Sequence, residues 1–181
     1  MKWLRRVHQD ERGKPLVAPH SFGGGYTVTG GILSNTIDPQ NRVVRYCVEG
    51  MEREQEGRHE EASRLFMLAW DQSKDAFERS IAAHYVARHQ TTPEGALHWN
   101  QEALTNADAI GDDRVQEFYP SLYLNMGKSH EDLGNLKDAK KFYALAADLI
   151  GCLPESPLAD LVRRGVMNGM QRTSNRPENE S

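Results

Sequence analysis

Two stretches of the chain place small and aromatic residues at the same intervals. Each begins with a glycine, followed by an alanine five residues later, an aromatic ring after nine residues and a second alanine after twelve. The two sets are Gly57, Ala62, Phe66, Ala69 and Gly134, Ala139, Tyr143, Ala146. The alanines and the ring recur at helical spacing, so in both stretches they form one face of a helix that starts soon after the glycine. The chain is therefore predicted to repeat one helical unit.

Caps and helix breakers divide the rest of the chain into further helices. Asp38 followed by Pro39 is a helix-start signal, and Thr92 with Pro93 is another. Pro120 disfavours a helix interior, so a break or a kink is expected there. The helices are predicted over about 39–56, 59–72, 75–89 and 92–110, then from 112 or 114 to 133, and from 136 to 150. A last helix, capped by Ser156, is expected to end near Met170 and to cover the final helix pair.

The alanine that opens the second helix of each pair recurs at a regular spacing. Ala62, Ala96 and Ala139 are separated by 34 and 43 residues. The first interval is the tetratricopeptide period, and the second adds nine residues to it. Tyr123 and Gly127 stand where that repeat has its Trp and Gly. Over about residues 40–151 the chain resembles the tetratricopeptide repeat (TPR) family and is similar to small single-domain bacterial TPR proteins. The middle repeat departs from the pattern because Asn100 replaces the aromatic residue.

The resemblance implies an all-α fold, a right-handed α-solenoid of about three TPR-like helix hairpins with a C-terminal capping helix. First helices would line a concave groove that binds a protein or peptide segment. The implied groove residues are Cys47, Met51, Ile81, Tyr85, Arg88, His89, Leu124, Asn125 and Lys128, and the same positions add Val44, Glu54, Gln55 and Glu131. Tyr85 and Arg88 are the expected anchors, because large planar side chains supply contact area and directed hydrogen bonds. The alternative is that Tyr85 packs between helices and that Arg88 is solvated. Most of the places that a carboxylate clamp for chaperone tails requires hold other residue types here, and only Asn125 is a partial match, so chaperone tails are not the expected partner.

Composition divides the chain into three parts. We expect an irregular or disordered N-terminal arm over 1–37, a helical repeat domain over 38–172 and a disordered tail over 173–181. The arm could instead form a short hairpin or come from a misplaced start codon. Its glycines do not form a phosphate loop, because Ile32 and Leu33 follow Gly31 in place of a lysine and a hydroxyl residue.

Charge and hydropathy exclude several classes of partner. Residues 38–160 carry 13 basic and 22 acidic side chains, which disfavours binding to a nucleic-acid backbone. The chain contains no apolar run of the roughly 18 residues that a membrane span requires. The charged residues 1–14 do not form a secretory leader, so a cytoplasmic protein is expected. Cys47 and Cys152 stand alone, which is typical of free thiols in a reducing compartment.

Catalytic and metal-binding patterns are weak. Neither HEEAS at 59–63 nor HEDLG at 130–134 contains the second histidine of a zinc-protease motif, and adjacent acids such as Glu60 and Glu61 diverge on a helix. We expect no metal, no cofactor and no catalysis. The predicted function is a non-catalytic interaction module. The alternatives are a peptide-responsive regulatory sensor, suggested by the lengthened third repeat, and an enzyme of unrecognised type. Self-association into a homo-oligomer stays open, because a repeat stack has two exposed ends.

Overall fold

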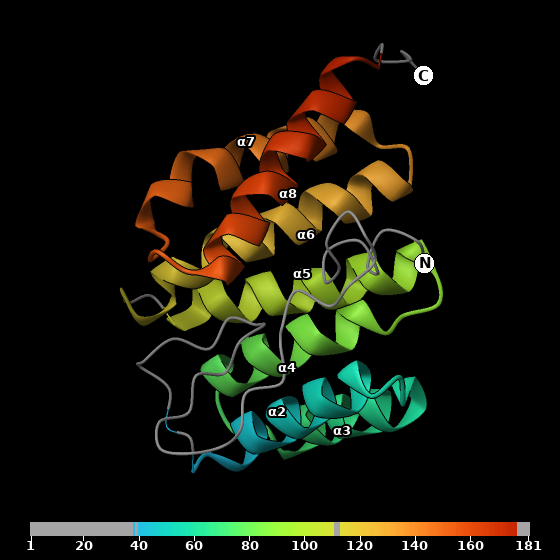
Figure 1. Ribbon diagram of the computed structural model, residues 1–181, viewed down its shortest axis with the longest axis vertical. Coiled ribbons are helices and arrows are strands. Elements are labelled where there is room, and N and C mark those ends of the chain that lie inside the picture. Colours follow the sequence, from blue (N-terminus) through green and yellow to red (C-terminus); the bar gives the residue numbers. More distant parts are fainter. Residues whose placement is uncertain (1–37, 39, 111–112, 177–181) are drawn as a thin grey trace.

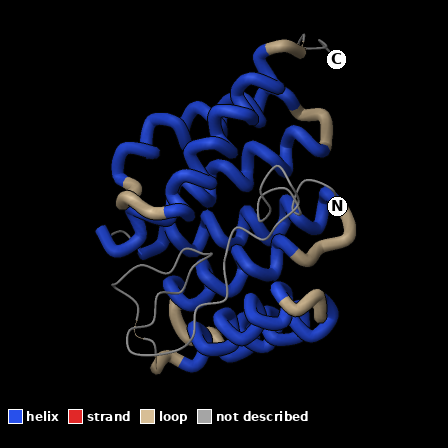
Figure 2. Tube along the Cα trace, viewed as in Figure 1, coloured by secondary structure: helices blue, strands red, loops and turns tan. Residues whose placement is uncertain are grey.

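The computed structural model describes residues 38, 40–110 and 113–176, and these residues form helices without a strand. The α-helices are α2 (Arg42–Gln55), α3 (His59–Gln72), α4 (Ala76–Arg88), α5 (Pro93–Ile110), α6 (Tyr119–Asp132), α7 (Leu136–Leu149) and α8 (Pro157–Ser174). Two 3₁₀ segments, η1 (Asp113–Phe118) and η2 (Ile150–Cys152), precede α6 and follow α7. Figures 1 and 2 show α2 to α7 running back and forth from one end of the molecule to the other, with α8 lying against α6 and α7. The predicted arm over 1–37 lies outside the described residues.

Hydrogen-bonding side chains set where the helices begin. Asp75 accepts from the amide of Glu78 at 2.8 Å, and Ser156 accepts from the amide of Ala159 at 3.1 Å. These contacts satisfy backbone donors that have no partner inside the helix. The predicted cap of the first helix was wrong, because the cap is Asn41 and not Asp38. The side chain of Asn41 accepts from the amides of Val43 and Val44 at 2.8 and 3.2 Å.

The repeated glycines end the first helices in the same way. Gly57 and Gly134 have φ angles of +78° and +79°, a conformation that glycine adopts without steric cost. In both turns the residue after the glycine donates its amide to a carbonyl five positions earlier, Arg58 to Arg53 at 2.8 Å and Asn135 to His130 at 2.9 Å. This is the hydrogen-bonding pattern of a Schellman cap. The chain therefore reverses direction identically between α2 and α3 and between α6 and α7.

The nine additional residues of the third pair lie before α6. They include η1, which leads directly into α6, and Pro120 occupies the first turn of α6, where a proline is tolerated. The predicted break at Pro120 is thus confirmed. At the other end, α8 continues through Ser174, beyond the predicted end near Met170 and the domain boundary at 172. The buried side chain of Thr173 belongs to the last turn of that helix and not to a tail.

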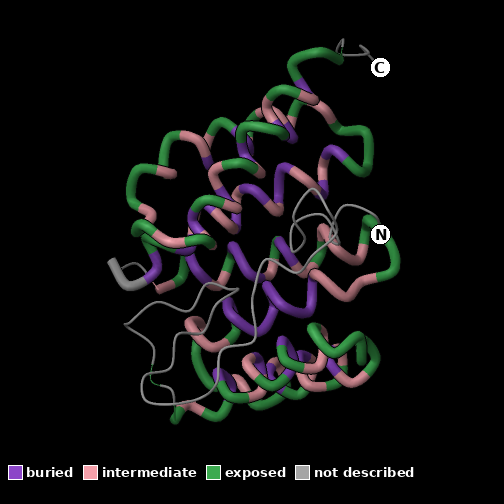
Figure 3. Tube along the Cα trace, viewed as in Figure 1, coloured by how far each residue is buried: buried purple, intermediate pink, exposed green. Residues whose placement is uncertain are grey.

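The core lies between helices that follow one another in the chain. Each helix packs against the next, and in addition α2 packs against α4 and α6 against α8. Figure 3 shows the buried residues along the inside of the stack and the exposed residues on its outer turns. The side chains of Phe66, Tyr85, Phe118 and Tyr143 are among the largest that are fully buried. Burial of aromatic and aliphatic groups of this size is the main stabilising contribution in a domain of this length.

Candidate functional site

The residues predicted to line a groove divide into two sets. The apolar and aromatic members are buried in the core: Cys47, Met51, Ile81, Tyr85 and Leu124. The polar members are less buried and lie on α4 and α6 or at the end of α4: Arg88, His89, Asn125 and Lys128. The set predicted from sequence is thus partly a packing surface between helices. Only its polar members present atoms near the surface.

Tyr85 is fully buried and does not offer a surface to a partner. Its ring stacks on Phe66 with centroids 5.2 Å apart and an interplanar angle of 16°. The guanidinium of Arg88 lies over the Tyr85 ring, 5.5 Å from its centroid. Burial raises the pKa of the Tyr85 hydroxyl and also that of the Cys47 thiol, so both groups are neutral. Tyr85 was predicted to be a binding anchor, with packing between helices as the alternative, and its burial among residues of α2, α3 and α4 agrees with the alternative.

Arg88 is bound to a partner within the chain. One of its terminal nitrogens donates to both carboxylate oxygens of Glu54, at 2.8 and 2.7 Å. The side chains are 9% and 20% exposed, so the pair is shielded from solvent over most of its surface. The Nε2 atom of His89 lies 3.7 Å from the same carboxylate, and its ring is 5.0 Å from that of Phe66. Arg88, one of the two predicted anchors, therefore fastens α4 to α2.

An equivalent ion pair fastens the last helix. Arg172 of α8 donates to both oxygens of Glu131 of α6, at 2.8 Å each, and the Tyr143 hydroxyl donates to Glu131 at 2.7 Å. Glu54 and Glu131 each lie four residues after the glycine that faces an aromatic ring, Gly50 or Gly127. Sequence reasoning did not identify Arg172. The repeat spacing places Glu54, Arg88 and Glu131 at equivalent positions of α2, α4 and α6, but Arg172 follows Glu131 by 41 residues, which matches neither repeat interval, so this spacing would not have identified it.

Polar side chains of α4 and α5 contact α6. His84 and Asn125 approach through Nδ1 and Nδ2 at 3.2 Å, and Asn100 donates to the Ser129 hydroxyl at 2.9 Å. Burial, together with the positive charge of Arg88, lowers the pKa of His84 to about 3, so its imidazole is neutral at physiological pH. Asn125 is half-buried, and Lys128 one turn later pairs with Asp132. Asn125 and Lys128 are the predicted residues that stay nearest to solvent on α6.

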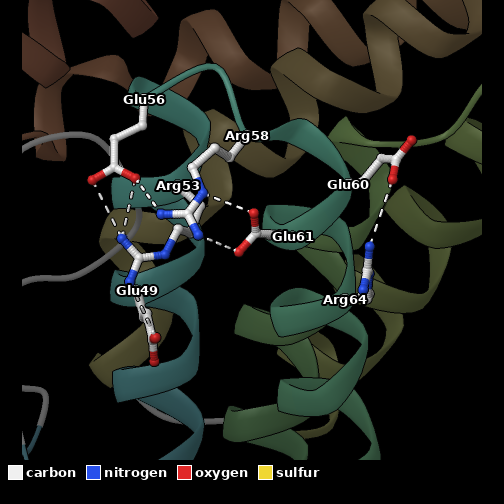
Figure 4. Close-up of polar contacts among 7 residues, drawn as sticks. All are labelled: Glu49, Arg53, Glu56, Arg58, Glu60, Glu61 and Arg64. Atoms are coloured by element: carbon white, nitrogen blue, oxygen red, sulfur yellow. Dashed lines mark hydrogen bonds and ion pairs between the residues drawn. The ribbon is translucent and has the colours of Figure 1, made fainter.

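Two other features lie away from this surface and were not predicted. A shallow depression of about 330 Å³ is lined by Glu94, Leu97, His98, Gln101, His130 and Leu133. At the turn between α2 and α3, arginines and glutamates form an exposed network, shown in Figure 4. Within it, Arg58 donates to both oxygens of Glu61, at 2.7 and 2.5 Å, and to Glu56 at 2.9 Å. Exposed pairs of this kind contribute little to stability.

The described residues hold no group of three or more His, Cys, Asp or Glu side chains placed to bind a metal ion. Within the same residues, no helix has the length and apolar character needed to cross a membrane. The thiols of Cys47 and Cys152 are both free. Comparisons with protein-family models, curated proteins and solved structures gave no match.

Proposed function

We propose that this protein is a non-catalytic interaction module that binds a protein or peptide segment along its first helices. The proposal treats α2–α3, α4–α5 and α6–α7 as TPR-like hairpins of a right-handed solenoid and α8 as a capping helix. Under that arrangement the first helices form the inner surface of the stack. The observation that carries the proposal is that α6 presents two partly exposed polar side chains, Asn125 and Lys128, about one turn apart.

Hydrogen-bonding chemistry favours an extended segment as the ligand. The amide of Asn125 can donate to a backbone carbonyl and accept from a backbone amide, and the ammonium of Lys128 can donate to a carboxylate or a carbonyl. Both side chains are partly exposed and lie one turn apart on α6. Neighbouring Arg88 and Glu54 are held in place by their ion pair, which gives the surface a fixed shape. A rigid surface reduces the entropy lost on binding.

Binding can be tested with a variant that removes the two partly exposed polar side chains on α6. We expect an Asn125→Ala, Lys128→Ala double variant to lose a specific partner in affinity capture from the source cytosol, followed by mass spectrometry. A synthetic segment of the captured protein should then bind the original chain at least tenfold more tightly than the double variant, as measured by calorimetry. Loss of both side chains removes directed hydrogen bonds but little buried apolar area.

The matched control is Lys137→Ala, Asn168→Ala, which makes the same two changes at exposed positions on α7 and α8. It should capture the same proteins as the original chain. If the Asn125 and Lys128 variant remains folded and its captured proteins are unchanged, the first-helix surface is not the binding site. Loss of binding in the control variant as well would point to a general effect of lost charge.

A further inference from the structure

The contact between the first and the second helix of a pair is formed by different residue types in the outer pairs and in the middle pair. In the outer pairs, a glycine on the first helix faces an aromatic ring on the second. A Cβ atom at Gly50 would lie 2.4 Å from the Phe66 ring, and one at Gly127 would lie 2.7 Å from the Tyr143 ring. The absence of a side chain on the glycine therefore lets each ring lie directly on the backbone of the first helix.

The middle pair has other residue types at these two positions. The position equivalent to Gly50 and Gly127 holds His84, and the position equivalent to Phe66 and Tyr143 holds Asn100. Both side chains are buried, with exposed fractions of 7%. The Asn100 amide nitrogen donates to Ser129, whereas its carbonyl oxygen has no hydrogen-bond partner among the described residues. A buried amide that is only half satisfied stabilises its surroundings less than a packed ring does.

The contacts between neighbouring first helices, with α8 compared as the neighbour of α6, also differ in their polar groups and in how closely the helices pack. The α2–α4 contact contains the Glu54–Arg88 ion pair, and the α6–α8 contact contains the Glu131–Arg172 ion pair. The backbones of α4 and α6 approach closely at fewer points than those of α2 and α4 or of α6 and α8. In contrast, α5 and α6 remain well packed through apolar side chains such as Leu122 and Met126. The α4–α6 contact is therefore the polar and loosely packed member of the series.

We infer that the molecule consists of two blocks, α2–α5 and α6–α8, that open relative to one another between α4 and α6 while α5 and α6 stay in contact. His84 of α4 and Asn125 of α6 form the polar contact that separates when the blocks open, whereas the Asn100–Ser129 hydrogen bond belongs to the α5–α6 contact that stays closed. Opening widens the first-helix surface beside Asn125 and Lys128. The motion requires no partner, so this inference goes beyond the proposed function and can fail or succeed independently of it.

The test is a set of distance distributions measured by pulsed electron spin resonance on the full chain without a ligand. Spin labels are attached in pairs to exposed positions, in a Cys152→Ser background that leaves the buried Cys47 unlabelled. The pair Thr91, which lies between α4 and α5, and Asp132, at the end of α6, joins one block to the other. The pairs Glu52 with Thr91 and Asp132 with Gln171 each lie within one block and share a label site with the first pair, so they control for label mobility.

We expect the Thr91–Asp132 distribution to be clearly broader than either control distribution. In a His84→Gly, Asn100→Phe variant, which copies the outer pairs into the middle one, it should narrow to the width of the controls. A Gln101→Phe variant, which adds a ring at an exposed position of α5, should leave it unchanged. The inference is overturned if the three distributions of the original chain are equally narrow. It is equally overturned if the double variant folds, by circular dichroism, and keeps the broad distribution. If that variant does not fold, the comparison within the original chain decides.

Discussion

Arg172 and Glu131 form the contact that fastens the C-terminal helix to the rest of the stack. The guanidinium donates two hydrogen bonds of 2.8 Å, and the Glu131 side chain is only 7% exposed. Burial alone would raise the pKa of the Glu131 carboxyl, but hydrogen bonds from Arg172 and Tyr143 lower it below its usual value. The carboxylate is therefore charged in the folded protein and depends on these two donors for its solvation.

Removal of Arg172 should destabilise the protein strongly. An Arg172→Ala variant leaves the buried Glu131 carboxylate without its cation, so we expect the free energy of unfolding to fall by about 3–5 kcal/mol. Urea denaturation followed by circular dichroism measures the change. The control is Arg164→Ala on the exposed side of the same helix, for which a change below about 0.5 kcal/mol is expected. Equal small losses in both variants would show that α8 is not held by this pair.

The end of α8 illustrates what the sequence could not predict. Residues 171–174 are locally polar, and their place in the helix depends on Glu131 and Tyr143, which lie about 30 to 40 residues earlier. By contrast, α3 begins and ends where predicted, because Gly57 and the apolar spacing of its own residues determine it locally.

The burial of Tyr85 in the candidate site could likewise not be predicted from the sequence. Its position on a first helix is predictable, but its exposure depends on how closely α2 and α4 approach. That approach follows from Gly50, which lets Phe66 lie against α2 and present its ring to Tyr85. The pairing of Glu54 with Arg88 also requires the distance between two helices. Repeat spacing places both residues correctly, but whether such side chains face a ligand or each other is decided by packing between helices.

His84 should make the stability of the protein depend on pH. Its folded-state pKa of about 3 lies below the ordinary value of 6.5, chiefly because of burial, so the unfolded chain binds more protons between these values. The contribution of the neutral His84 to the free energy of unfolding is therefore complete above about pH 6.5. It is lost as the pH falls toward 3, by up to about 1.4 kcal/mol for each pH unit. We expect a His84→Gln variant to show a smaller loss between pH 7.5 and 5 in urea titrations. The exposed His98→Gln variant should behave as the original chain does, and a similar effect in both variants would contradict this assignment.

Gly50 should not tolerate a side chain. A Cβ atom there would lie 2.4 Å from the Phe66 ring, so Gly50→Ala forces the ring or the helix to move. We expect a net loss of about 1–3 kcal/mol, even though alanine favours a helix by about 1 kcal/mol over glycine. Thermal unfolding measures the loss, with Gly151→Ala as the control because a Cβ atom there would meet nothing within 4 Å. Addition of Phe66→Leu to Gly50→Ala should recover part of the stability, and a stable Gly50→Ala variant would show that the ring has room to move.

Two substitutions at Tyr85 separate the contribution of its ring from that of its hydroxyl. The ring stacks on Phe66 and is fully buried, so Tyr85→Ala should cost about 3–5 kcal/mol through the cavity that it leaves. The hydroxyl oxygen has no hydrogen-bond partner among the described residues. Since a buried unpaired hydroxyl carries a desolvation cost of about 1–3 kcal/mol, Tyr85→Phe should leave stability unchanged or raise it by about 1 kcal/mol. Urea denaturation of both variants tests this pair of expectations, and Tyr85→Phe should also leave partner capture unaffected. A marked loss of stability in Tyr85→Phe would mean that the hydroxyl donates a hydrogen bond in solution.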